Sequence, residues 1–188
     1  MAHGMLVSAP MTRLALVAVI LASTAASASA GTYVGLGVGT APATSGDVTM
    51  VEAGRSGRLQ LGYRFGPLSV EGLASRADLA RDDGASYSWT TLGVAGRVSH
   101  ALGAGFEVFG RLGYQGTSIS QSGGHDDFSG KGLMFGGGFE YRLNLVLASG
   151  SLFVDYNVEH SSLDRDGVYG MEYGLTSRVW TLGAILSL

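Results

Sequence analysis

The chain contains no cysteine, only three prolines and few charged residues, which make up 14% of its 188 positions. Without cysteine, the lipid anchor of a lipoprotein has no attachment point. The formal net charge of -3 lacks the basic excess of nucleic-acid-binding proteins, so no nucleic-acid partner is expected. Outside the N-terminus, no apolar run approaches the roughly 20 residues that a membrane-spanning helix needs. Because 46% of the residues are nevertheless hydrophobic, alternating strands are predicted.

The beginning of the chain has the layout of a secretory signal peptide. Arg13 precedes an apolar stretch at 14–22, and the small residues of 23–30 end in an Ala-Ser-Ala sequence. The alternative is an uncleaved membrane anchor, but this apolar stretch is too short to cross a bilayer. We therefore predict cleavage directly before Gly31.

This prediction divides the chain into a signal peptide, 1–30, and one barrel domain, 31–188. Residues 1–10 look like an upstream extension, which leaves Met1 and Met11 as alternative starts. No further domain is expected after the last residue, and no cofactor is expected in the barrel domain.

The strand pattern is clearest at 105–115. One face of this segment is uncharged and has aromatic ends, with Phe106, Val108, Gly110, Leu112 and Tyr114. The other face carries a carboxylate and a guanidinium beside small residues, with Glu107, Phe109, Arg111, Gly113 and Gln115. A period of two indicates a strand. An apolar face with terminal aromatics and a polar opposite face suit a strand between lipid and an enclosed lumen.

Similar alternation recurs in eight segments along the chain, at about 31–40, 57–66, 68–75, 87–98, 105–115, 131–143, 152–159 and 174–188. The connections between them are alternately long and short. Short turns at one end and long loops at the other are typical of outer-membrane barrels. A sheet in lipid must also close, because unpaired backbone groups are costly there. The predicted fold is all-β, an eight-stranded antiparallel up-and-down transmembrane β-barrel that follows a cleaved signal peptide.

Counting along each segment assigns ten charged residues to the lumen. The five arginines are Arg58, Arg64, Arg97, Arg111 and Arg142, and the five acids are Glu71, Glu107, Glu140, Asp155 and Glu159. Side chains about fill an eight-stranded barrel, and an unpaired buried charge costs several kcal/mol. We therefore expect a charge-paired, closed lumen. The alternative is a narrow small-molecule or ion channel.

The last segment ends in an alternating apolar series that resembles the C-terminal signal of outer-membrane proteins. Its residues are Trp180, Leu182, Ala184, Leu186 and Leu188. Leu188 stands where such signals usually end in phenylalanine. The expected partner for this signal is the outer-membrane insertion machinery.

Three glycine- and aromatic-rich segments, 106–114, 135–143 and 154–156, resemble the OmpA-like family of small outer-membrane barrels. The resemblance covers essentially all of 31–188. It implies a monomer in the bacterial outer membrane that contacts lipid and lipopolysaccharide. It also implies a structural, adhesive or host-interacting role without enzymatic activity.

Two segments contain residue types found at catalytic or metal sites. Lipid A deacylases of the PagL type carry a His-x-Ser-Asn motif, and here His160 and Ser162 match it while Leu163 replaces the asparagine. Glu172 could complete a Ser-His-acid group. A solvated strand end is the favoured interpretation. His125, Asp126 and Asp127 could bind a divalent cation, but a solvated loop tip is favoured there.

The predicted long loops carry more acids than bases. Nine acids, Asp47, Glu52, Asp78, Asp82, Asp83, Asp126, Asp127, Asp164 and Asp166, stand against Arg55, Arg76, Arg81, Lys131 and Arg165. Such charge attracts cations and basic partners. We therefore expect either that the loops bind envelope glycolipid or a host or neighbouring-cell surface, or that the acids only keep them soluble.

Overall fold

A computed structural model describes residues 31–46, 54–80, 86–121, 127–144, 149–165 and 172–188. The predicted signal peptide therefore lies outside the described residues. Within them, no helix is long and apolar enough to cross a membrane. The strands are β1 (Thr32–Thr40), β2 (Ala43–Gly46), β3 (Arg55–Phe65), β4 (Leu68–Ala80), β5 (Ser86–Gly103), β6 (Phe106–Gln121), β7 (Asp127–Asn144), β8 (Ser149–Arg165) and β9 (Glu172–Ser187).

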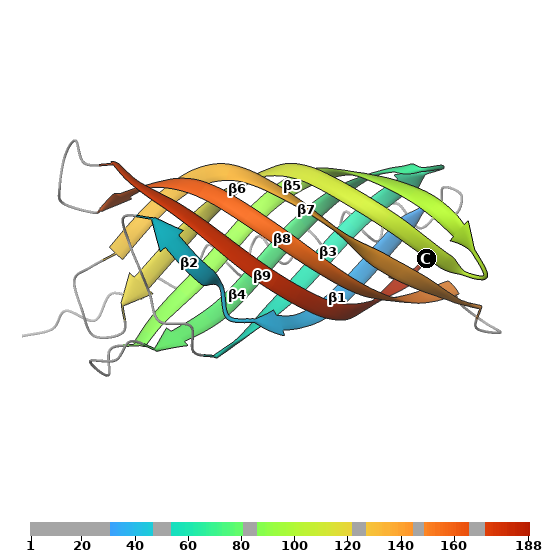
Figure 1. Cartoon of the computed structure of the whole chain (residues 1–188), viewed down its shortest axis with the longest axis horizontal. Helices are drawn as coiled ribbons and strands as arrows, with labels where there is room; N and C mark the ends of the chain where they lie inside the picture. Colours follow the sequence, from blue (N-terminus) through green and yellow to red (C-terminus); the bar gives the residue numbers. More distant parts are fainter. Residues whose placement is uncertain (1–30, 47–53, 81–85, 122–126, 145–148, 166–171) are drawn as a thin grey trace, which may run out of the picture.

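The strands form one tilted, antiparallel ring (Figure 1). Each long strand pairs with the next along the chain, and β1 pairs with β9 to close the ring. The short strand β2 was not predicted. It follows a break at Ala41 and Pro42 and pairs with β9 alone, so β1 and β2 together take one place in the ring. The predicted eight-stranded barrel is confirmed.

Several strands extend further than the sequence indicated. Residues 76–80, 116–121, 127–130 and 160–165 were predicted as loops, but they continue β4, β6, β7 and β8. The alternation persists in these extensions with its polarity reversed. In β6, Ile119 is completely buried inside the barrel, whereas Ser118 and Ser120 are exposed outside. Polar residues outside and apolar residues inside are what a strand in water requires.

The reversal marks the edge, nearest the long loops, of an apolar band on the outer wall. Large hydrophobic residues are exposed along the band on every long strand, for example Leu36, Leu59, Val94, Leu112, Phe135, Val154 and Leu182. Toward the long-loop end, a basic side chain follows the band on five strands. We call this group the basic belt, and its members are Arg55, Arg76, Lys131, His160 and Arg178, all exposed.

Two tight turns at the opposite end require unusual backbone angles. Gly66 has φ 66°, and between β5 and β6 Gly103, Ala104 and Gly105 have φ 96°, 51° and 85°. Glycine adopts such angles without steric cost, so both turns can be short. The start of β1 and the end of β9 lie at this same end, where the Leu188 N–H donates to the Thr32 carbonyl at 2.9 Å.

Candidate functional site

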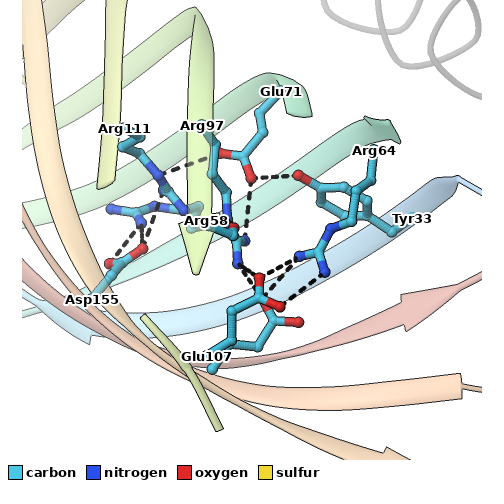
Figure 2. Close-up of polar contacts among 10 residues, drawn as sticks. Tyr33, Arg58, Arg64, Glu71, Arg97, Glu107, Arg111 and Asp155 are labelled. Carbon is cyan, nitrogen blue, oxygen red and sulfur yellow. Dashed lines mark hydrogen bonds and ion pairs between the residues drawn. The ribbon is translucent and has the colours of Figure 1, made fainter. Parts of the chain in front are cut away.

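The lumen is crossed by a cluster of paired charges at its middle (Figure 2). Glu71 on β4 is its centre, and its side chain is completely buried. The Tyr33 hydroxyl donates to Glu71 Oε1 at 2.5 Å. Arg97 Nη1 lies 3.4 Å from the same oxygen, and Arg111 Nε lies 3.3 Å from Oε2. One carboxylate therefore joins residues of β1, β4, β5 and β6.

Asp155 on β8 binds the opposite side of the cluster. Arg58 Nη1 donates to both carboxylate oxygens, at 2.9 and 2.8 Å. Arg111 Nη1 lies 3.1 Å from Oδ2, and Asn157 Nδ2 donates to Oδ1 at 2.8 Å. Because Arg111 contacts both Glu71 and Asp155, it connects two walls of the barrel across the lumen.

Glu107 and Glu140 form the part of the cluster nearest the turn end. Arg97 and Arg142 make close ion pairs with Glu140 and Glu107 respectively. Arg64 Nη2 lies 3.2 Å from Glu107 and 3.4 Å from Glu140. Arg142 is half-exposed and Arg64 partly exposed, so the cluster reaches water at this mouth.

The sheet register explains why these charges must pair across the lumen. Arg97 lies directly opposite Arg111 on neighbouring strands, and Glu107 lies directly opposite Glu140. Like charges in such positions repel each other. The repulsion within each pair is offset by opposite charges from other strands, because an unpaired buried charge is costly. The pairing therefore depends on the closed barrel rather than on any single hairpin.

One glycine provides the space that a carboxylate of the cluster needs. Gly138 lies opposite Asp155 in the register. A Cβ atom at this glycine would come within 2.8 Å of the Asp155 Cβ. It would come even closer to the Val154 carbonyl oxygen. A larger residue would therefore push the β8 backbone away and move Asp155 relative to Arg58 and Arg111.

Eight of the ten lumen charges that the sequence analysis assigned are buried; Arg64 is partly exposed and Arg142 exposed. Glu159 is separate from the others. Its carboxylate accepts a hydrogen bond from Ser177 at 3.1 Å, and no arginine among the described residues is paired with it. Nine of the ten residues therefore form one cluster, which we call the lumen charge cluster.

Sequence reasoning missed the aromatic part of this cluster. The Arg97 guanidinium carbon lies 3.8 Å from the centre of the Phe109 ring, and that of Arg111 lies 5.1 Å from it. Such stacking is favourable for a desolvated guanidinium. Phe109 has the lumen parity of Glu107 and Arg111, so its inward direction was predicted but its contact with two arginines was not.

An apolar plug fills the lumen at the long-loop end, and it was not predicted either. It consists of buried side chains from β4, β5, β6, β8 and β9 and from the break after β1: Ala41, Ala77, Leu79, Tyr87, Trp89, Ile119, Leu163 and Leu175. Phe128 and Tyr173 pack against it. The signal for it was present in the sequence, as apolar residues of lumen parity: Tyr87, Trp89 and Leu175 lie within predicted strands, and the other plug residues lie within predicted loops.

The candidate catalytic group does not assemble among the described side chains. His160 and Ser162 both face outward on β8. The imidazole Nδ1 lies 3.0 Å from Thr176 Oγ1, and Leu163 is buried in the plug. The Glu172 side chain lies outside the described residues. Of the proposed cation site, only Asp127 is described, as the exposed first residue of β7.

A cavity of about 580 Å³ opens at the turn end of the lumen. Tyr33, Arg64, Glu140 and Arg142 line its inner part, and Ile185 lines its wall. The lumen charge cluster therefore forms the floor of this vestibule.

Comparisons with known proteins agree with this architecture. Residues 12–186 match the model of the outer membrane protein beta-barrel domain. No curated protein matches the sequence significantly. Similar solved structures include neisserial surface protein A, with 16% identity, TM-score 0.65 and coverage of 83% of this chain and 96% of that chain.

Two further structures are similar at comparable identity. Ail of Yersinia pestis, in complex with the heparin analogue sucrose octasulfate, has 17% identity, TM-score 0.54 and coverage of 85% and 99% of the two chains. OprG from Pseudomonas aeruginosa has 16% identity, TM-score 0.51 and coverage of 85% and 96%. At such identities these structures show the fold alone. The family match, which spans most of the chain, shows more: the chain belongs to the outer membrane protein beta-barrel domain family and is a protein of the bacterial outer membrane.

Proposed function

We propose that this protein is a closed barrel that acts by contact at its outer surface rather than by transport or catalysis. The observation that carries the proposal is the filling of the lumen at two levels. The lumen charge cluster crosses the middle, and the apolar plug fills the long-loop end. A solute would have to separate buried ion pairs at one level and apolar side chains at the other.

The surface offers two kinds of contact. The apolar band contacts lipid, and the extended strands carry polar residues beyond it. Envelope glycolipid is one partner class that suits the basic belt, since guanidinium and ammonium groups bind phosphate. A host or neighbouring-cell surface would meet the tips of the extended strands. The terminal residues Trp180, Leu182, Leu186 and Leu188 remain the proposed signal for the insertion machinery, and a monomer remains the proposed state.

A narrow channel is the second candidate, and the vestibule at the turn end favours it. The cavity brings water as far as Arg64, Glu140 and Arg142. Between the cluster and the plug, polar side chains such as Gln115, Thr117 and Ser161 face the lumen and are buried. A channel would need both the cluster and the plug to move aside.

Conductance in a planar bilayer tests the proposal. We expect wild-type protein to form no stable channels, because the two levels block the lumen independently. Trp89→Ala, which thins the plug, should also remain closed, because the charge cluster is intact in that variant. Stable channels in the wild type would contradict the closed lumen. Channels in Trp89→Ala alone would show that the plug is the only barrier.

A further inference from the structure

A groove of about 520 Å³ lies on the outer wall and is lined by residues of β8, β9 and β1 and by the start of β3. Its walls within the apolar band are Val38, Val154, Trp180 and Leu182. Trp180 is held on two sides. Its backbone N–H donates to Thr40 Oγ1 at 3.2 Å, and its ring packs against Tyr156 with centroids 4.8 Å apart.

The sequence explains why the wall is hollow here. Val38 pairs with Gly57 on β3, and a Cβ atom added to Gly57 would meet nothing within 4 Å. The outward face of β3 therefore has no side chain beside Val38. Toward the long loops, β1 ends at Thr40. After Ala41 and Pro42 the chain continues as β2, which pairs with β9 alone. Gly57 therefore leaves the wall beside the groove without a side chain, and the strand break lies at the end of the groove nearest the long loops.

Two arginines of the basic belt stand at the upper end of the groove. Arg55 lines it, and Arg178 is the next outward-facing residue of β9 above Trp180. They lie on strands that flank β1, and Arg178 is two residues along β9 from the position level with Arg55. Two strand spacings across and about 7 Å along the strand therefore separate their backbones by roughly 12 Å. Among the described residues, neither guanidinium makes an ion pair, whereas Arg76 of the same belt lies 3.8 Å from Asp78.

On the adjoining strand β4, the exposed Asp78 is level with Arg55 in the register, but it lies 3.8 Å from Arg76, and the other strands near the two arginines carry few acids. β1, β2 and β3 contain no aspartate or glutamate, and the only acid of β9 is its first residue, Glu172. The turn end of the wall differs. Its outward-facing described residues include no lysine or arginine, and aromatic residues such as Phe65, Phe106 and Tyr141 stand there instead. Among the described residues, the lysine and arginine side chains of the outer wall therefore lie on one side of the membrane, and the only basic side chain of the outer wall at the turn end is His100.

We propose that this groove binds one phosphorylated lipid of the outer leaflet, with an acyl chain lying over Val38 and Leu182 and a headgroup phosphate on Arg55 and Arg178. The apolar walls and open shape suit a hydrocarbon chain. The two guanidinium groups, which make no ion pair with a described residue, suit phosphate, which arginine can bind through two parallel hydrogen bonds. The proposal rests on the proposed function, because it names a partner for the outer surface.

Native mass spectrometry of the detergent-solubilised barrel with added lipid A tests this site. Each arginine replaced by glutamine should weaken binding of the first lipid A by about tenfold, which corresponds to about 1.4 kcal/mol, because a charge-assisted hydrogen bond to phosphate is lost. Arg76→Gln is the matched control, because it removes a belt charge outside the groove. It should change the affinity by less than Arg55→Gln or Arg178→Gln.

Two further measurements test the apolar groove and the phosphate contact separately. Val38→Trp, which fills the groove without changing charge, should weaken lipid A binding, and inorganic phosphate alone should not displace the lipid. Equal affinities for wild type, Arg55→Gln and Arg178→Gln would overturn the proposal. Equal losses in Arg76→Gln would also overturn it, because they indicate diffuse attraction by the belt. A channel in the conductance test would refute the closed lumen but leave this lipid site standing.

Discussion

Replacing Glu71 by leucine is expected to destabilise the folded barrel by about 3–5 kcal/mol, the usual cost of removing one partner from a buried ion pair. The change leaves Arg97 and Arg111 opposite each other with one carboxylate fewer between them. It also removes the acceptor of the Tyr33 hydroxyl. Urea unfolding of the protein in lipid vesicles, followed by tryptophan fluorescence, measures the effect.

The matched control for this change is Glu159→Gln. Glu159 is also a buried carboxylate of the lumen, but its partner is the Ser177 hydroxyl rather than an arginine. An amide oxygen can accept the same hydrogen bond, so the loss should be about 1 kcal/mol or less. Equal losses of stability in both variants would contradict the claim that ion pairs of the lumen charge cluster stabilise the barrel.

Replacing Leu112 by arginine is expected to cost about 2–4 kcal/mol, as for other basic residues placed at the bilayer midplane of an outer-membrane barrel. Leu112 is 64% exposed on the outer wall and lies near the centre of the apolar band on β6. The arginine would need to leave hydrocarbon or draw water into it. The same urea titration in vesicles measures the change.

Ser118→Arg is the control, because it lies on the same strand and the same face, three outward positions nearer the long-loop end. Its side chain is exposed above the basic belt, where the outer wall is polar. The substitution should therefore leave stability nearly unchanged. A similar loss of stability for Leu112→Arg and Ser118→Arg would contradict the position of the membrane edge between these two residues.

The sequence predicted the barrel because lipid imposes a strict two-residue period on each strand. The prediction of strand ends failed where the strands extend beyond the lipid. At 116–121 the period continues, but Ile119 points inward and Ser118 outward, and the polar outward residues lead the sequence pattern to predict a loop. The pattern of polarity, rather than its period, locates the membrane edge.

The contacts inside the lumen could be predicted only in part. Parity placed Arg97, Arg111, Glu107 and Glu140 on the inner face. Their partners depend on the register, which sets like charges side by side and so requires pairing across the lumen. A single sequence does not give the register of strands that are far apart in the ring. The groove beside β1 likewise depends on the pairing of Val38 with Gly57 and on the unpredicted strand β2.

The closed lumen can be tested most directly with two neighbouring serines, since the chain has no cysteine of its own. Ser161 faces the lumen and is 2% exposed, whereas Ser162, the next residue of β8, is exposed outside. Each is replaced by cysteine and treated with a small, water-soluble thiosulfonate reagent in the folded state. We predict that Ser162→Cys reacts rapidly and that Ser161→Cys reacts only after unfolding. Equal rates at the two positions in the folded barrel would contradict the closed lumen.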